Sequence, residues 1–166
     1  MKVLVTYYSQ TGNTKKVAQA IHEGIQKADK ELLPINEVKD LESYDVIFVG
    51  FPVQASSVPV KVEPILKGIP DGKKVAVFAT HGSLRKGQLA VTAFDYAASL
   101  VSNAKVIGTF GCRGKVKSSL IEALMKKPEH RAWAEQAQGA APHPDNADLE
   151  DAKDFAKNMM KKAGSM

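Results

Sequence analysis

Residues that could hold an anion are concentrated in one short segment near the start of the chain. An apolar run, Val3–Tyr7, is followed by Ser9, Gln10, Thr11, Gly12, Asn13 and Thr14, and then by a helical pattern. At the N-terminus of a helix, backbone N–H groups lack partners and the helix dipole favours negative charge. Ser9 or Asn13 alone would be enough to cap a helix. A run of six such residues favours a phosphate site, held by neutral dipoles because the segment contains no Lys or Arg.

Two isolated side chains offer other chemistry. Cys112 is the only cysteine, which excludes an internal disulfide. Its neighbour Arg113 could lower its pKa for a redox role, although simple packing at a strand end is the favoured interpretation. His81 could hydrogen-bond a ligand or relay a proton, and a plain loop or capping role is favoured for it. The other histidines show no ligand spacing, so no metal site is predicted.

Short apolar runs alternate with helical patterns along the chain. Strands are expected at Val3–Tyr7, Leu32–Val38, Val46–Phe51, Lys74–Thr80 and Lys105–Phe110. Helices are expected at Thr14–Ala28, just after Pro59, at Gln88–Val101, at Ser118–Lys127, around Trp133, and from about Ala147 to Lys162 with Asp145 or Asn146 as its cap. Pro34 suits an edge strand. The alternation predicts an α/β fold with a doubly wound five-stranded parallel sheet in the order 2-1-3-4-5. We expect one domain over residues 1–166, with a helical insertion over 113–145 before the last helix.

The composition and the charge of the chain limit the possible classes of function. The content of 44% apolar and 25% charged residues is typical of a globular protein. Residues 84–131 hold nine Lys or Arg against three acids, a net +6, which leaves −1 for the rest of the total of +5. Such a segment attracts an anionic small molecule or an acidic protein, or is only a solvated face. It lacks the interleaved aromatic residues of a nucleic-acid site. We see no leader or membrane anchor and expect a cytoplasmic protein.

The segment YSQTGNT after a strand resembles the fingerprint of the flavodoxin family, in which an (S/T)-x-T-G-x-T loop wraps the phosphate of FMN. The resemblance covers the whole alternation of strands and helices. It implies FMN as the cofactor, with its ring between the loops after the third and fourth strands. Besides residues 9–14, the cofactor-binding residues would then be Pro52, Val53, Gln54, Ala55, Thr80, His81 and Gly82.

Two departures from the flavodoxin pattern stand out. The two ring loops contain no Trp or Tyr, although flavodoxins usually place one against each ring face. Trp133, in the insertion, could cover the flavin, but burial between helices is the favoured interpretation. Flavodoxins are also acidic, whereas this chain places cations near the expected flavin mouth: Arg85, Lys86, Arg113, Lys115 and Lys117. Nearby cations stabilise an anionic reduced flavin, so we expect a less strongly reducing cofactor.

The resemblance implies an electron-transfer protein that exchanges electrons with a redox partner, which should present an acidic surface. One alternative is an FMN-dependent oxidoreductase acting on a small anionic substrate, similar to NAD(P)H:quinone reductases or flavodoxin-like protoporphyrinogen oxidases. A second alternative is a module without redox activity that binds another phosphorylated ligand.

Overall fold

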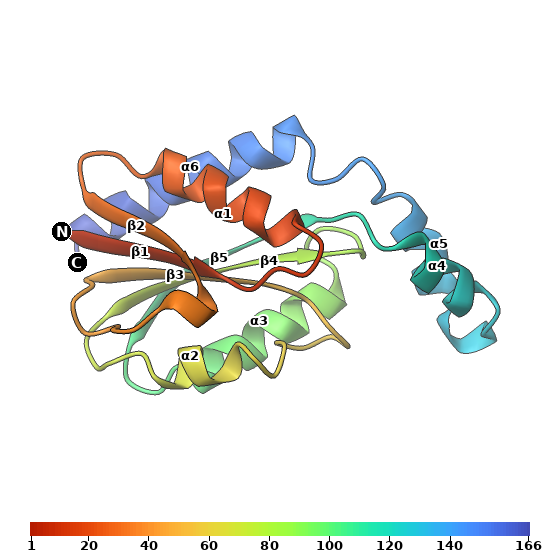
Figure 1. Cartoon of the computed structure of the whole chain (residues 1–166), viewed down its shortest axis with the longest axis horizontal. Coiled ribbons are helices and arrows are strands. Elements are labelled where there is room, and N and C mark those ends of the chain that lie inside the picture. Colours follow the sequence, from red (N-terminus) through yellow and green to blue (C-terminus); the bar gives the residue numbers. More distant parts are fainter.

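A five-stranded parallel sheet in the order β2-β1-β3-β4-β5 forms the centre of the computed structural model, which describes residues 1–166 (Figure 1). The strands are β1 (Lys2–Tyr7), β2 (Asp29–Pro34), β3 (Val46–Pro52), β4 (Lys74–His81) and β5 (Lys105–Arg113). The predicted α/β class and strand order are confirmed. Because all the strands are parallel, the loops that follow them emerge at a single edge of the sheet.

Helices cover both faces of the sheet. They are α1 (Asn13–Gly24), α2 (Glu63–Lys67), α3 (Gln88–Leu100), α4 (Ser118–Met125), α5 (Arg131–Gln138) and α6 (Asn146–Gly164), with single 3-10 turns at Ile35–Glu37 and Pro128–His130. Helices α1 and α6 lie on one face, and α2 and α3 lie on the other (Figure 1). Helices α4 and α5 pack against one another and project beyond the carboxyl edge, at the end of the molecule opposite the two termini. No helix has both the length and the apolar character needed to span a membrane.

The core consists of two apolar layers, one on each side of the sheet. Val3 and Val5 face α1 and α6, whereas Leu4 between them faces α2 and α3. Phe48 and Phe78 fill the first layer and are fully buried. Burial of a side chain of this size contributes about 1.5–3 kcal/mol. Since both faces are covered, the central strands β1, β3 and β4 are buried along almost their whole length, as their apolar sequence runs indicated.

Two predicted boundaries near the N-terminus were wrong. The first helix ends at Gly24 and not at Ala28, because Ile25 is extended and Lys27 has a positive φ of 56°. The second strand is Asp29–Pro34, not Leu32–Val38. Its charged start is tolerated at the sheet edge, where Asp29 pairs with Lys2, and Pro34 ends the ladder because it lacks an N–H.

Later boundaries differ less. Helix α2 begins at Glu63 because Pro59–Val62 forms a separate turn, closed by the Val62 N–H on the Pro59 carbonyl at 2.9 Å. Strand β5 continues to Arg113, three residues beyond the predicted end at Phe110. Asp145 caps α6 in a capping box with Asp148, which confirms the predicted start.

Candidate functional site

A cavity of about 780 Å³ lies at the carboxyl edge, between the loops that follow β1, β3 and β4 and the α4–α5 hairpin. We define the hairpin as residues 118–138. All the predicted site residues line the cavity except Gly12. The hairpin and the segment leading to it add Lys115 and Lys117, which were expected near the flavin mouth, and Trp133, which was considered as a cover for the flavin. They also add residues that sequence reasoning did not assign to the site: Val116, Leu120, Leu124 and His130.

The first wall is the Ser9–Thr14 loop, which leads directly into α1. Gly12 takes a left-handed conformation with φ 93°, which only glycine adopts without strain. Ser9 Oγ accepts hydrogen bonds from the N–H groups of Gly12 at 3.1 Å and Lys15 at 3.4 Å. One serine therefore does the capping. The N–H groups of Asn13 and Thr14, in the first helical turn, have no intrahelical partner and are available to an anion.

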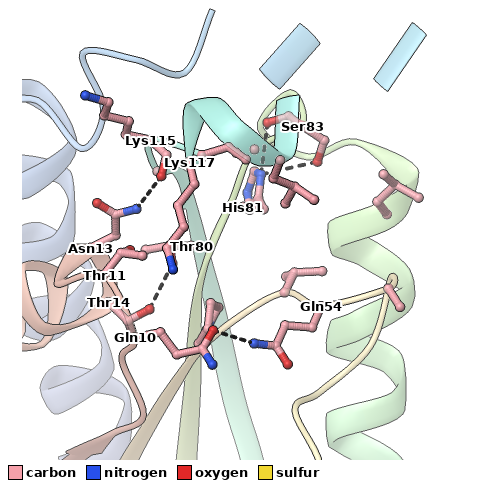
Figure 2. A pocket seen from close by; sticks show the side chains of 18 of the residues that line it. Gln10, Thr11, Asn13, Thr14, Gln54, Thr80, His81, Ser83, Lys115 and Lys117 are labelled. Carbon is pink, nitrogen blue, oxygen red and sulfur yellow. Dashed lines mark hydrogen bonds between the residues drawn. The ribbon is translucent and has the colours of Figure 1, made fainter. Parts of the chain in front are cut away.

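Side chains of this loop hold the site together through hydrogen bonds to neighbouring segments, as Figure 2 shows. Thr14 Oγ1 lies 2.8 Å from Thr80 Oγ1 in a buried hydrogen bond. Asn13 Nδ2 donates to the Lys115 carbonyl at 2.9 Å, and Gln54 Nε2 donates to Gln10 Oε1 at 3.1 Å. The side chains of Gln10, Asn13 and Thr14 therefore join the loop to its neighbours, and the unpaired backbone N–H groups are available to an anion.

The second wall is a tight turn after β3. Gln54 and Ser57 exchange N–H···O bonds of 3.0 and 2.9 Å. The residues between them, Ala55 and Ser56, have φ of 49° and 61°. Positive φ at both central positions defines a type I′ turn, which normally selects Asn or Gly. Two residues with side chains are therefore held in a strained conformation, an arrangement that is common at ligand sites.

The third wall is the end of β4, where His81 is only 5% exposed. Its Nδ1 lies 3.0 Å from the Ser83 carbonyl, and because a carbonyl only accepts, Nδ1 carries the proton. Nε2 is buried without a partner. Burial foremost, and also the charges of Arg113 and Arg85, lower the pKa of His81. The imidazole is therefore neutral near pH 7, part of the buried wall and not a surface loop residue.

The hairpin supplies the fourth wall. A Cβ on Gly82 would lie 3.4 Å from Trp133 Cζ2, so the hairpin packs directly on the loop after β4. It would also lie 2.5 Å from Val116 Cγ2, in the segment that leads to the hairpin. Trp133 is half-buried and lines the cavity together with Leu120 and Leu124. The favoured prediction that Trp133 buries itself between helices was wrong. The i, i+4 spacing of Leu120 and Leu124 indicates an apolar face on this helix. The spacing does not show what that face covers, because those residues come from elsewhere in the chain.

The cavity is electropositive. No Asp or Glu lines it, and neither Lys115 nor Lys117 has an ion-pair partner. Other cations expected at the mouth have different roles. Arg85 pairs with Asp151 at 2.8 Å, and Arg113 donates to the carbonyls of Gly82 and Gln136, which anchors the hairpin. The site thus favours a ligand that carries negative charge.

Cys112 plays no part in the site. It is fully buried and packs in the apolar layer under α1 and α6, which agrees with the packing role that was favoured from the sequence. Burial raises the pKa of its thiol to about 12, against the lowering that its neighbour Arg113 suggested. A thiol of this kind is not reactive near neutral pH.

Residues 4–157 match the family model of the flavodoxin domain. The chain belongs to the flavodoxin family. Flavodoxin-like domain-containing protein BilS from Clostridioides difficile (strain CD3) is 34% identical to it, over 98% of each chain. An NAD(P)H dehydrogenase (quinone) from Acidovorax ebreus (strain TPSY) is 28% identical, over 64% of this chain and 68% of that protein. Oxidised flavodoxin 2 from Bacillus cereus shares the fold, with a TM-score of 0.65 at 23% identity, covering 98% of this chain and 99% of its own.

FMN is the cofactor of this flavodoxin-family protein. The donor set fits this molecule, because the N–H groups after Gly12 suit a phosphate and the cavity wall carries no acid that would repel one. The loops after β3 and β4 flank the cavity beside the phosphate loop and offer backbone groups to a flat polar ring.

Proposed function

We propose that this flavodoxin-family protein is an electron carrier, which binds one FMN without a covalent bond and passes electrons to or from a partner redox protein. The observation that carries the proposal is the cavity itself, which lies at the carboxyl edge beside an anion-binding loop and has no acidic side chain in its wall. When bound, FMN supplies the redox chemistry, and the protein supplies binding, orientation and electrostatics.

In this proposal the residues of the chain have distinct tasks. The backbone of Ser9–Thr14 holds the phosphate, and the side chains of that loop keep it in place through Thr80 and Gln54. The loops Pro52–Ala55 and Thr80–Gly82 flank the ring. Trp133 contributes the aromatic surface that both loops lack, and with Leu120 and Leu124 it excludes water from one side of the cavity.

The partner that suits this surface is acidic. Lys86, Lys115 and Lys117 are exposed around the carboxyl edge and have no ion-pair partners within the chain. Leu84 and Leu120 add exposed apolar area, with 55% and 46% of their surface accessible. Cations around an apolar centre would steer an acidic protein towards the site. A single domain over residues 1–166 and a cytoplasmic location complete the proposal, and the unpaired Cys112 agrees with a reducing compartment.

A second candidate is an FMN-dependent oxidoreductase that acts on a small anionic substrate. The observation that favours it is the part of the cavity under the hairpin, where His130 and Trp133 extend the wall beyond the three strand-end loops. The Acidovorax relative is named as a quinone dehydrogenase that uses NAD(P)H. Both candidates bind the cofactor in the same place, so they differ only in what reaches it.

The test begins with the visible spectrum of the purified protein, before and after reconstitution with FMN. A protein that stays colourless and does not take up FMN would contradict both candidates. For the reconstituted protein, NADPH oxidation is then measured with and without an added flavin-dependent NADPH reductase. Reduction that requires the reductase supports the electron carrier. Steady turnover by the protein alone, with a quinone as acceptor, supports the oxidoreductase.

A further inference from the structure

Lys117 is a free cation in the wall of the cofactor cavity. It lines the cavity together with Ser9, Thr11, Asn13 and Thr14, and no carboxylate of the chain pairs with it. Figure 2 shows its side chain extending from the start of α4 towards Thr14 and Thr80, whereas the Lys115 ammonium points away from them.

The backbone that carries Lys117 is fixed beside the phosphate loop. Asn13 Nδ2 donates to the Lys115 carbonyl at 2.9 Å, and the Lys115 N–H donates to the His143 carbonyl at 2.8 Å. The Gly114 N–H donates to the His81 carbonyl at 2.9 Å. A Cβ on Gly114 would lie only 2.9 Å from Asn13 Nδ2, so the two segments are in close contact. The segment preceding Lys117 is therefore anchored to the loop.

The phosphate loop itself contains no cation. A phosphate monoester carries about 1.5 to 2 negative charges at pH 7. The neutral N–H groups of Ser9–Thr14 compensate part of that charge. Lys15 and Lys16 follow the loop in the sequence, but neither lines the cavity. Among the lysines of the cavity wall, Lys117 is the one that extends towards the loop.

We propose that Lys117 binds the phosphate of the cofactor, so that the anion is shared between the backbone of the loop after β1 and the residue that immediately precedes the hairpin. The inference rests on the proposed function, in which FMN occupies this cavity. Lys117 stands immediately before Ser118, where α4 begins, so the phosphate holds the start of the hairpin against the body of the protein. Binding of FMN then has a salt-dependent component that binding of riboflavin, which has no phosphate, does not have.

The experiment is a pair of titrations of the apoprotein, with FMN and with riboflavin, followed by the quenching of flavin fluorescence. Lys117→Met is compared with the wild type and with a matched control, Lys16→Met, because Lys16 follows the phosphate loop in the sequence but does not line the cavity. Lys117→Met is expected to weaken FMN binding by about tenfold or more, as for loss of one hydrogen bond to a charged group. The same variant should leave riboflavin binding unchanged. Lys16→Met should bind both flavins nearly as the wild type does.

Other results would overturn the inference. An equal loss for FMN and riboflavin would place Lys117 against the ring, and no loss for either would remove it from the site. Thermal unfolding of each apoprotein checks that the variants are folded, and Lys117→Arg, which keeps the charge, should retain most of the preference for FMN. A wild-type protein that binds neither flavin contradicts the proposed function itself. Equal binding of FMN and riboflavin by the wild type and by every variant would overturn only the inference about Lys117.

Discussion

Thr14 and Thr80 share a buried hydrogen bond of 2.8 Å between their hydroxyl groups, and this bond ties the first turn of α1 to the end of β4. The two residues are 1% and 3% exposed, so neither hydroxyl can turn to water. The bond connects the wall that offers the phosphate site, after β1, to a wall that flanks the ring, at the end of β4, across the single intervening strand β3.

Replacing one of these threonines should lower the free energy of unfolding by more than replacing both does. Thr14→Val or Thr80→Val leaves one buried hydroxyl without a partner, a loss of about 1–3 kcal/mol in the free energy of unfolding. The double variant removes both polar groups and should recover part of that loss. Urea unfolding of the apoprotein measures all three variants in one cycle. Strictly additive single effects would show that the bond contributes nothing.

The turn after β3 should become more stable with glycine. Ser56 has φ 61°, a left-handed conformation that costs a residue with a side chain about 1–2 kcal/mol. Ser56→Gly is therefore expected to raise the free energy of unfolding of the apoprotein by up to about 1 kcal/mol, since part of the gain is offset by the greater freedom of glycine in the unfolded chain.

Ser57→Gly is the matched control for this turn. Ser57 is not among the residues with positive φ, so glycine brings only the entropic cost there and should destabilise the protein. Thermal melts of the two variants beside the wild type give the comparison. Equal destabilisation by both substitutions would contradict the assignment of strain to the turn.

Much of this site follows from the sequence, and the reason is geometric. Once Val3–Tyr7 and Lys74–Thr80 are assigned to parallel strands, the loops after them must share one edge, which brings Ser9–Thr14 next to His81 without any knowledge of contacts. The hairpin does not follow in this way. Trp133 reaches the cavity by packing on Gly82, and the segment before Lys117 is held by a hydrogen bond from Asn13 to the Lys115 carbonyl. Both depend on tertiary contacts and not on local pattern.

Cys112 shows the same limit. The neighbouring Arg113 in the sequence suggested a lowered pKa, but adjacent residues of a strand point to opposite faces. Cys112 faces the layer under α1 and α6, where desolvation raises its pKa to about 12. Charge read along the chain was therefore a poor guide to electrostatics, whereas the alternation of the strand predicts the burial correctly.

His81 should make the protein less stable in mild acid. Its pKa in the folded state is lowered, first by burial and then by the charges of Arg113 and Arg85, while the unfolded chain keeps the ordinary value near 6.5. Below about pH 6.5 the unfolded state binds the proton that the folded state resists. Stability from this residue is therefore present above that pH and lost as pH falls through the lowered folded pKa.

The comparison that tests this is between the wild type and His81→Asn, whose amide can still donate to the Ser83 carbonyl. Urea unfolding at pH 7 and at pH 5 should show a smaller loss of stability in His81→Asn than in the wild type. His22 also has a lowered pKa, from burial and from Lys30, so His22→Asn serves as the second variant. A pH dependence that is identical in His81→Asn and the wild type would mean that His81 does not carry it.

The unpaired cations at the cavity should raise the reduction potential of the bound flavin. Added electrons place negative charge on the flavin, and the cavity wall around it holds Lys115 and Lys117 and no acid. The cations therefore stabilise the reduced flavin relative to the oxidised flavin. The double variant Lys115→Gln with Lys117→Gln should lower the two-electron midpoint potential by an amount on the order of tens of millivolts. The measurement is made at saturating FMN in low salt, where screening is weakest.

Lys105→Gln, at the opposite end of β5, is the control and should leave the potential unchanged. The same midpoint potential in the wild type and the double variant would show that the charge of the cavity does not affect the reduction potential of the flavin.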